Sequence, residues 1–336
     1  MKRVLVTGGA GYIGSHTVRA LVEAGYDVTV IDLLRSSFGT GNRAAVPAGV
    51  RLIEGSCGDV AVLERAWRES GGFDAVIHFA ALILVDESVR EPARYYENNV
   101  VCSLRLFDFA LRAGVRALIF SSSGTIYGNF TGRGLIPESA PLVPINPYGR
   151  SKLMTETMLH DLLAVHPAAR AMTLRYFNPA GAKLDLSLGQ MRPLATHLVN
   201  VAAEAAVGRR DVVRVFGSDY PTPDGTCVRD YIHIEDVVDA HVLALRALQA
   251  GEPSAVLNVG YGQPYSVLEV IEEMKRVSGA PFRVEIGERR SGDPPYLAAD
   301  PRLIKEMLGW KPRFDSLETI CRTQFLWEKK RQSLTI

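Results

Sequence analysis

Residues 4–14 read V-L-V-T-G-G-A-G-Y-I-G, a short apolar run followed by three glycines in the pattern G-x-x-G-x-x-G. The run from Lys2 to Val6 predicts a strand. The apolar positions Ile13, Val18, Leu21 and Val22 predict a helix after the turn, which Gly25 ends. Glycines let a backbone approach a pyrophosphate, which the N-H groups and dipole of a helix N-terminus then hold. The stretch therefore predicts a dinucleotide-binding turn.

A second strand with an acid at its end supports this interpretation. Residues 27–32 read D-V-T-V-I-D, which places Asp32 about 20 residues after the glycines, where such a turn needs its acid. A carboxylate there accepts hydrogen bonds from the adenosine ribose and repels a 2′-phosphate, so Asp32 predicts NAD rather than NADP. Arg35 complicates this, because an arginine can neutralise such a phosphate. The structural alternative is a tight turn, with Asp32 as a helix N-cap.

Strand and helix patterns alternate along the first 120 residues. We expect strands at 50–53, 74–81 and 115–120, helices at 61–69 and from Tyr95 to Gly114, and a loop from Phe38 to Gly49. Such alternation is typical of an α/β fold with a doubly wound parallel sheet of Rossmann type. The nearly continuous apolar character of 74–81 fits a strand covered on both faces, in which His78 is a packed residue rather than a ligand or base.

The most reactive pattern lies further on, at Tyr148 and Lys152. These residues stand four apart and leave one face of a helix. An ammonium beside a phenol favours the phenolate, so a tyrosine with an ordinary pKa of about 10 could act as a base near neutral pH. Ser121-Ser122-Ser123 follows a strand and would reach the same crevice, although a serine run can be simple turn chemistry. In isolation, Y-x-x-x-K would be read as a surface pair.

Composition narrows the class of partner. The chain has 336 residues, with 38 Lys and Arg against 37 Asp and Glu, so nothing in its charge indicates nucleic acid or an anionic membrane. No apolar run approaches the roughly 20 residues that span a bilayer. The four cysteines are scattered, which argues against a disulfide framework or a zinc site and fits a reducing cytoplasm. We expect a cytoplasmic protein with a small-molecule substrate and no bound metal.

Eight motifs carry a resemblance to a known family. They are T-G-G-A-G-Y-I-G-S at Thr7, H-F-A-A at His78, Y-Y-E-N-N-V at Tyr95, S-S-S-G-T-I-Y-G at Ser121, N-P-Y-G-R-S-K at Asn146, L-R-Y-F-N-P-A-G-A at Leu174, D-Y-P-T-P-D-G-T-C-V-R-D-Y-I-H at Asp219 and R-R-S-G-D at Arg289. In this order, over essentially the whole chain, the sequence resembles the extended short-chain dehydrogenase/reductase family. Its later motifs are similar to those of the sugar-nucleotide epimerases that interconvert UDP-glucose and UDP-galactose.

The resemblance implies NAD-dependent, reversible inversion at C4 of a UDP-hexose through a transient 4-keto sugar. Tyr148 would remove the C4 hydroxyl proton, Ser123 would hydrogen-bond the 4-oxygen, and Lys152 would lower the pKa of Tyr148 and hold the nicotinamide ribose. The implied cofactor site comprises Gly8, Gly11, Tyr12, Ile13, Gly14, Asp32, Phe79, Ala80, Ala81, Asn98, Ser121, Tyr148, Lys152 and Phe177. The implied UDP-sugar site comprises Ser123, Tyr148, Asn178, His197, Phe216, Arg229, Arg290, Asp293 and Leu297.

The remaining patterns and the resemblance together predict two parts. We interpret residues 1–178 as an NAD-binding domain with the catalytic residues, and 179–336 as a smaller α/β lobe, mainly for the UDP-sugar. The lobe's expected elements are helices at 236–250, 267–278, 301–310 and 317–330 and a strand at 282–286. In the resembling family, part of this lobe, here about 230–250, returns to the first domain. A homodimer formed through helices near 98–112 and 152–166 is also implied.

Several positions depart from the family pattern. Ser56 replaces an aspartate that bonds adenine, Ile83 replaces a lysine near the phosphates, and Leu33-Leu34 follows Asp32 where D-N-L is usual. These changes predict partial loss of NAD on purification. His197 replaces an asparagine near the sugar, and either donates to the substrate or is a satisfied histidine at a helix start.

Leu297 aligns with the position at which the resembling family gates the space around the sugar C2 substituent. Tyrosine there excludes N-acetyl sugars and smaller residues admit them, so leucine predicts UDP-glucose and UDP-galactose as substrates, with the N-acetyl pair as a further possibility.

Three alternatives remain. A 4,6-dehydratase needs an acid and a base beside the threonine, as T-D-E, where this chain has Gly124-Thr125-Ile126. A UDP-glucuronate epimerase usually lacks the R-Y-F-N-P-A-G-A block. A non-catalytic dinucleotide sensor has no need of a phenolate base, which the retention of Ser123, Tyr148 and Lys152 disfavours.

Overall fold

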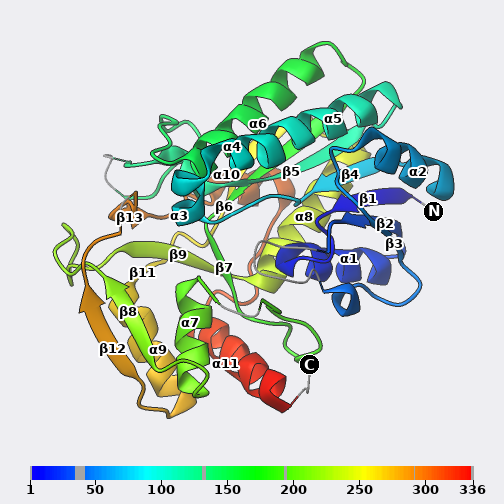
Figure 1. Ribbon diagram of the computed structural model, residues 1–336. Coiled ribbons are helices and arrows are strands. Elements are labelled where there is room, and N and C mark those ends of the chain that lie inside the picture. Colours follow the sequence, from blue (N-terminus) through cyan, green and yellow to red (C-terminus); the bar gives the residue numbers. More distant parts are fainter. Residues whose placement is uncertain (1, 35–41, 131–133, 193–194, 291, 334–336) are drawn as a thin grey trace.

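The computed structural model describes residues 2–34, 42–130, 134–192, 195–290 and 292–333. A seven-stranded sheet lies between layers of helices, with a smaller lobe beside it (Figure 1). Across this sheet the strands are β10 (Ala255–Val259), β6 (Arg170–Tyr176), β5 (Ala117–Ser123), β4 (Ala75–His78), β1 (Arg3–Thr7), β2 (Asp27–Asp32) and β3 (Arg51–Glu54). Every neighbouring pair is parallel. The expected doubly wound α/β fold is confirmed.

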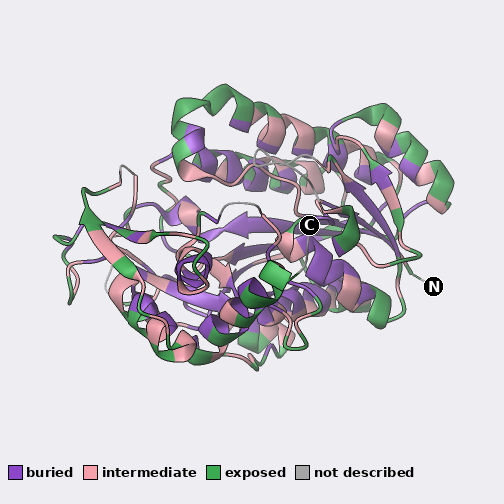
Figure 2. Ribbon diagram, turned by 60° about the horizontal axis from the view of Figure 1, so that its bottom comes forward, coloured by how far each residue is buried: buried purple, intermediate pink, exposed green. Residues whose placement is uncertain are grey.

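Helices cover both faces of the sheet. One face is covered by α1 (Tyr12–Glu23) and α8 (Ile234–Ala250), and the other by α2 (Val60–Ser70), α5 (Cys102–Arg112) and α6 (Pro147–Ala164). On α6 lie α3 (Val85–Arg90) and α4 (Pro92–Tyr96), whereas α10 (Arg302–Leu308) packs against α8 and β10. In the smaller lobe, α7 (Leu198–Ala206), α9 (Val267–Ser278) and α11 (Leu317–Ser333) pack on one another. Side chains alternate along β1, so Val4 and Val6 pack on the side of α1 and α8, whereas Leu5 packs on the side of α2, α5 and α6. Figure 2 shows the buried residues concentrated in the strands and on the inner sides of the helices. No helix in the described ranges has the length and apolar character to cross a bilayer.

The order of the strands creates the binding crevice. From β1 the chain winds outward through β2 and β3, and it then returns to β4 on the other side of β1. The carboxyl ends of β1 and β4 therefore flank the point where the winding reverses, which is where open α/β sheets bind ligands. The glycine turn follows β1 and Phe79-Ala80-Ala81 follows β4.

The smaller lobe has two short sheets. One contains β11 (Pro264–Ser266), β9 (Val228–His233) and β13 (Tyr296–Leu297), with β7 (Asn178–Ala180) also paired to β9. The other pairs β8 (Val212–Phe216) with β12 (Arg283–Gly287). From the C-terminal half of the chain, α8 packs against β5 and β6, and β10 pairs with β6 at the edge of the large sheet.

Four details differ from the expectations. Val22, assigned to the apolar face of α1, is 38% exposed, because the buried stripe runs through Val18 and Leu21 instead. β5 continues through Ser123, since all three serines pair with β6. The helix expected from Tyr95 contains a π-helical segment at Glu97–Val101. The pairing of β10 with the large sheet was not foreseen. Arg35 and residues 38–41 of the expected loop lie outside the described residues.

Candidate active site

The glycine turn fits the pyrophosphate of a dinucleotide. Gly8 has a φ of +72°, and a Cβ atom placed on it would lie 2.6 Å from the Ala80 nitrogen. A Cβ atom on Gly14 would lie 2.2 Å from the Gly8 oxygen, so only glycine lets the start of α1 pack against the turn. Gly11 is the N-cap of α1, where no side chain caps the helix and the first turn has no acidic residue. The N-H groups of this first turn are thus available to an anion.

Asp32 lies beside this turn at the end of β2. Its Oδ2 accepts a hydrogen bond from the Ala10 N-H at 3.0 Å, and its Oδ1 accepts one from the Leu34 N-H at 2.9 Å. Burial raises the pKa of Asp32, and these two hydrogen bonds partly offset that effect. Asp32 is not a helix N-cap here. Its position at the edge of the glycine turn fits the adenosine ribose of NAD.

The segment after β4 completes the cofactor crevice. Ala80 faces Gly8, and the Phe79 ring lies 4.7 Å from the ring of His241 on α8. The Asn98 amide donates to Asn99 Oδ1 at 2.9 Å. His78 is buried, with Thr7 Oγ1 at 2.6 Å and Ser103 Oγ at 2.7 Å from its ring nitrogens, and burial lowers its pKa to about 3. His78 is therefore a packed strand residue, as the sequence predicts.

Local sequence places Tyr148 and Lys152 at the start of α6. Asn146 is the N-cap, and its side-chain oxygen accepts from the Gly149 N-H at 2.8 Å, while Pro147 occupies the first helical position. Tyr148 consequently lies in the first turn and Lys152 one turn later. A hydrogen bond with Ser123, at the end of β5, lowers the pKa of Tyr148. The Lys152 Nζ donates to the Ser121 main-chain oxygen at 2.8 Å. The three predicted catalytic residues are thus brought together.

Desolvation opposes one expectation about this trio, that Lys152 lowers the pKa of Tyr148. Burial raises the pKa of Tyr148 to about 12, and the influences that lower it are the Ser123 hydrogen bond and the charge of Arg192, not that of Lys152. The Lys152 ammonium is itself buried, which lowers its pKa to about 8, although the charge of Glu156 partly offsets this. The simple picture of an ammonium stabilising a phenolate neglected desolvation, which acts against the charged form of both groups.

Arg192 is a site residue that the sequence reasoning missed. Its charge acts on Tyr148 and on His197, and burial together with Arg192 and Arg290 lowers the pKa of His197 to about 4. Arg192 lies in an irregular segment between β7 and α7, so no periodic pattern marked it. The sequence analysis also gave no role to Glu156, although Glu156 stands four residues after Lys152.

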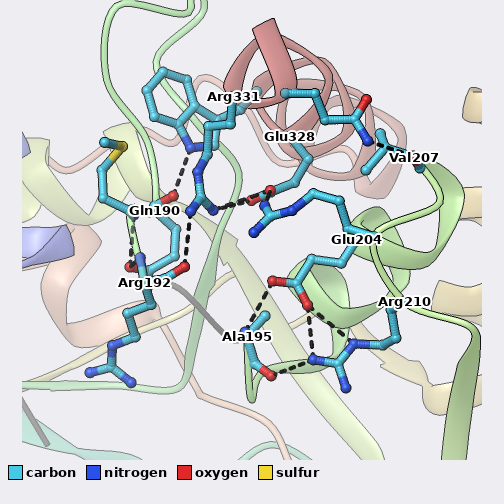
Figure 3. A network of polar contacts seen from close by, with 12 residues as sticks. Gln190, Arg192, Ala195, Glu204, Val207, Arg210, Glu328 and Arg331 are labelled. Atoms are coloured by element: carbon cyan, nitrogen blue, oxygen red, sulfur yellow. Dashed lines mark hydrogen bonds and ion pairs between the residues drawn. The ribbon is translucent and has the colours of Figure 1, made fainter. Parts of the chain in front are cut away.

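Two buried carboxylates hold the segment that carries Arg192 (Figure 3). The Arg192 main-chain oxygen accepts from Arg331 Nη2 at 3.1 Å, and Arg331 pairs with Glu328 at 3.1 Å. The Ala195 N-H donates to Glu204 Oε1 at 3.1 Å. Glu328 and Glu204 are 1% and 2% exposed. Figure 3 shows the Arg192 side chain pointing away from these contacts. Helices α7 and α11 thereby fix the backbone around a cation of the site.

Apart from Ser123 and Tyr148, the predicted UDP-sugar residues come from the smaller lobe, where five of them gather in two groups. Arg229 on β9 faces Asp293 at 3.9 Å, and β13 pairs Leu297 with Arg229 in register. The Arg290 guanidinium lies 4.1 Å from the centre of the Phe216 ring. Asn178 is on β7, beside β9, and Phe177 stacks on Tyr127 at 6.4 Å.

A cavity of about 530 Å³ opens beside the second group. Phe216 and Arg290 line it together with Asp86, which lies 3.5 Å from Arg290. Ser123, Tyr148 and Lys152 are outside this cavity. Arg214, Arg289 and Arg290 all line it, and guanidinium groups can hold phosphate oxygens through charge-assisted hydrogen bonds.

Comparisons with known proteins agree with this geometry. The profile of the NAD dependent epimerase/dehydratase family matches residues 4–260. A UDP-glucose 4-epimerase of Azospirillum brasilense is 50% identical over 327 residues, which are 97% of this chain and 92% of that protein. The crystal structure of a UDP-glucose 4-epimerase from Brucella ovis with NAD superposes with a TM-score of 0.90 at 42% identity, covering 97% of this chain and 98% of that one. A UDP-Glc/GlcNAc 4-epimerase from Campylobacter jejuni gives a TM-score of 0.83 at 44% identity, covering 98% and 100%.

Proposed function

This chain belongs to the NAD dependent epimerase/dehydratase family, and we propose that Ser123, Tyr148 and Lys152 carry out its reaction. The protein is an NAD-dependent enzyme that epimerises C4 of a UDP-hexose. The observation that best supports this assignment of roles is the buried contact between Tyr148 and Ser123. Tyr148 lies one helical turn before Lys152, and Ser123 lies at the carboxyl end of β5.

In this proposal the Tyr148 phenolate removes the proton of the C4 hydroxyl, and the Ser123 hydroxyl donates to the 4-oxygen. Bound NAD supplies the acceptor and the donor of the C4 hydride. The 4-keto sugar turns its other face to the cofactor, and Tyr148 returns the proton to the 4-oxygen. A base held in a hydrogen bond and tuned by a nearby cation is what this proton transfer requires.

The two cationic residues have separate tasks. Arg192 favours the Tyr148 phenolate by charge, as its effect on the pKa of Tyr148 indicates. Lys152 on α6 is bound to the Ser121 carbonyl near the end of β5 and holds the nicotinamide ribose there. Gly8, Gly11, Gly14 and Asp32 bind the pyrophosphate and the adenosine ribose.

The UDP-sugar extends from the trio to the smaller lobe. Arg229 and Arg290 bind the pyrophosphate, Asp293 binds the uridine ribose, and Phe216 lies against Arg290 at the cavity. Asn178, His197 and Leu297 surround the sugar. We infer that residues 1–178 hold the cofactor and that 179–336 hold the substrate, apart from α8 and β10, which pack on the large sheet.

We also propose a cytoplasmic homodimer. Helices α5 and α6 pack together and present apolar side chains to solvent, with Leu104 40% and Met154 46% exposed. Two such faces would bury these side chains in a bundle of four helices. Sedimentation of the purified protein checks the dimer.

The function is tested by incubating the protein with UDP-galactose and added NAD and measuring UDP-glucose. Tyr148→Phe should nearly stop the interconversion while leaving NAD and UDP-sugar binding intact. Binding without interconversion by the parent protein would favour a dinucleotide sensor. A Tyr148→Phe variant as fast as the parent would show that another residue is the base.

A further inference from the structure

A buried carboxylate lies directly behind the catalytic trio. Glu156 is on α6, four residues beyond Lys152, and its side chain is 8% exposed. None of the steps proposed above uses it. A carboxylate in this environment persists as an ion only where hydrogen bonds and a counter-charge compensate for its lost hydration.

Glu156 joins α6 to the two central strands. The Ser122 Oγ on β5 donates to Glu156 Oε1 at 2.5 Å, and Arg175 on β6 donates to both carboxylate oxygens at 3.1 and 3.2 Å through Nε. Arg175 is held in turn by the Tyr127 hydroxyl, 2.9 Å from its Nη1, and that hydroxyl donates to Asn258 Oδ1 at 2.8 Å. The carboxylate is therefore fixed on every side by buried partners.

The three serines of β5 explain why this contact matters for the site. Side chains alternate along a strand, so Ser122 faces α6 while Ser121 and Ser123 face the opposite side. Ser121 Oγ contacts His241 on α8 at 2.9 Å, its main-chain oxygen accepts from Lys152, and Ser123 meets Tyr148. The bond from Ser122 to Glu156 thus ties the strand that carries Ser123 to the helix that carries Tyr148 and Lys152.

We propose that Glu156 is a positioning residue for the epimerisation, which keeps the buried Lys152 in its ammonium form and locks the end of β5 to α6. The inference rests on the proposed function for its kinetic consequence. Glu156 is the only carboxylate whose charge supports the Lys152 ammonium within the described residues, and burial alone lowers the pKa of Lys152. Glu156 acts on the Lys152 ammonium although Arg175 is bound to the Glu156 carboxylate, because that carboxylate lies on the same helix as Lys152, one turn away.

The other polar groups around Lys152 do not replace it. Tyr148 lies on the same helix, and the charge of Lys152 lowers the pKa of His78 on β4. Tyr176 on β6 and His241 on α8 both contact Ser121, the residue to which Lys152 is bound. Burial raises the pKa of Tyr176 and lowers that of both histidines, so these three groups are neutral near pH 7, and burial also disfavours the Tyr148 phenolate. Among the described residues, removal of the Glu156 charge therefore takes away the carboxylate that supports the ammonium.

Glu156→Gln is the decisive variant, because glutamine can still accept the Ser122 hydrogen bond while the charge is lost. The pKa of Lys152 is read by NMR of the NAD-loaded protein with ¹³Cε-labelled lysine, with Lys152→Arg assigning the signal. We expect the pKa of Lys152 to fall by about one pH unit or more, and the alkaline limb of kcat/KM to move down with it. The KM for UDP-galactose should stay within about twofold of the parent value.

Arg175→Gln is the matched control, since it disrupts the same ion pair but leaves the Glu156 charge, so the pKa of Lys152 should not fall. If Glu156→Gln does not fold, Glu156→Gln/Arg175→Gln removes both charges, and the pKa of Lys152 should again fall. An unchanged pKa of Lys152 in folded protein overturns the proposal. The NMR readout does not require turnover, so a parent protein that failed to interconvert sugars would sink the proposed function and leave this test intact.

Discussion

The Lys152 Nζ lies 2.8 Å from the main-chain oxygen of Ser121, and this bond fixes the ammonium to the strand that ends in Ser123. Lys152 thereby serves the site by holding its geometry as well as by its charge. The tyrosine depends on Ser123 and Arg192 instead. Each of the catalytic groups can accordingly be probed by a different substitution.

The pKa of Lys152 predicts where kcat/KM falls on the alkaline limb of its pH profile. The Lys152 pKa of about 8 means that the ammonium is present below that pH and lost above it. We expect kcat/KM, which reports on the free enzyme, to fall as pH rises through about 8. Lys152→Met should lower kcat/KM at pH 7 by about 100-fold or more and abolish this limb. Lys275→Met, a change at a half-buried lysine on α9, should leave the alkaline limb in place. A flat profile from pH 7 to 10 would contradict the assignment.

The charge of Arg192 predicts where activity rises on the acidic side of the pH profile. Arg192→Gln removes a charge that lowers the pKa of Tyr148, so less phenolate forms at a given pH. We expect kcat at pH 7 to fall about tenfold and the rise of activity with pH to begin at higher pH. Arg276→Gln, which disrupts an exposed ion pair on α9, is the control. Identical pH profiles for Arg192→Gln and the parent would remove Arg192 from the site.

Gly8 predicts a specific loss of cofactor binding. In Gly8→Ala the new Cβ atom would meet the Ala80 nitrogen at 2.6 Å, in a left-handed conformation that costs about 1–3 kcal/mol. Gly25→Ala is the matched control, because Gly25 has a φ of +82° and no atom within 4 Å of the added Cβ. Both variants should lose thermal stability, but only Gly8→Ala should lose NAD, measured by absorbance after gel filtration. Equal NAD content in the two variants would show that the turn does not contact the cofactor.

Ser56 predicts weak retention of NAD. Its Oγ accepts from the Gly58 N-H at 3.2 Å, so a short hydroxyl occupies the position where an aspartate could reach adenine. We expect the parent to lose part of its NAD during dialysis and Ser56→Asp to retain more, as quantified by enzymatic assay of the released nucleotide. A parent protein that keeps stoichiometric NAD through dialysis would rule this out.

Leu297 predicts the range of sugars. It is buried against the cluster of Ile126 and Tyr127, with Phe177 packed at its edge. Leu297→Ala should raise kcat/KM for UDP-GlcNAc relative to UDP-glucose by about tenfold, and Leu297→Tyr should lower it by a similar factor. The ratio is measured with both sugar pairs under one set of conditions. Complete inertness of the parent towards UDP-GlcNAc would reject dual specificity.

The parts of the fold and site that could be predicted were those encoded within a few residues. The turn from Gly8 to Gly14 and the spacing of Tyr148 and Lys152 are local patterns with one dominant physical meaning. The pairing of β10 with β6 joins segments about 80 residues apart, and its five residues carry no signal of their partner. Arg192 acts on Tyr148 from an irregular segment that contacts two helices distant in the sequence. The pKa values of the trio depend on burial, which spacing alone does not reveal.

The late arrival of β10 also constrains how the protein is made. When Tyr176 has left the ribosome, the outer edge of β6 has no partner, and it gains one only after Val259 is added. At about 5–20 residues per second, translation of that interval takes roughly 4–16 s. During biosynthesis the nascent chain thus displays an open strand edge, which is the kind of surface that chaperones shield and that invites pairing between neighbouring polysomal chains.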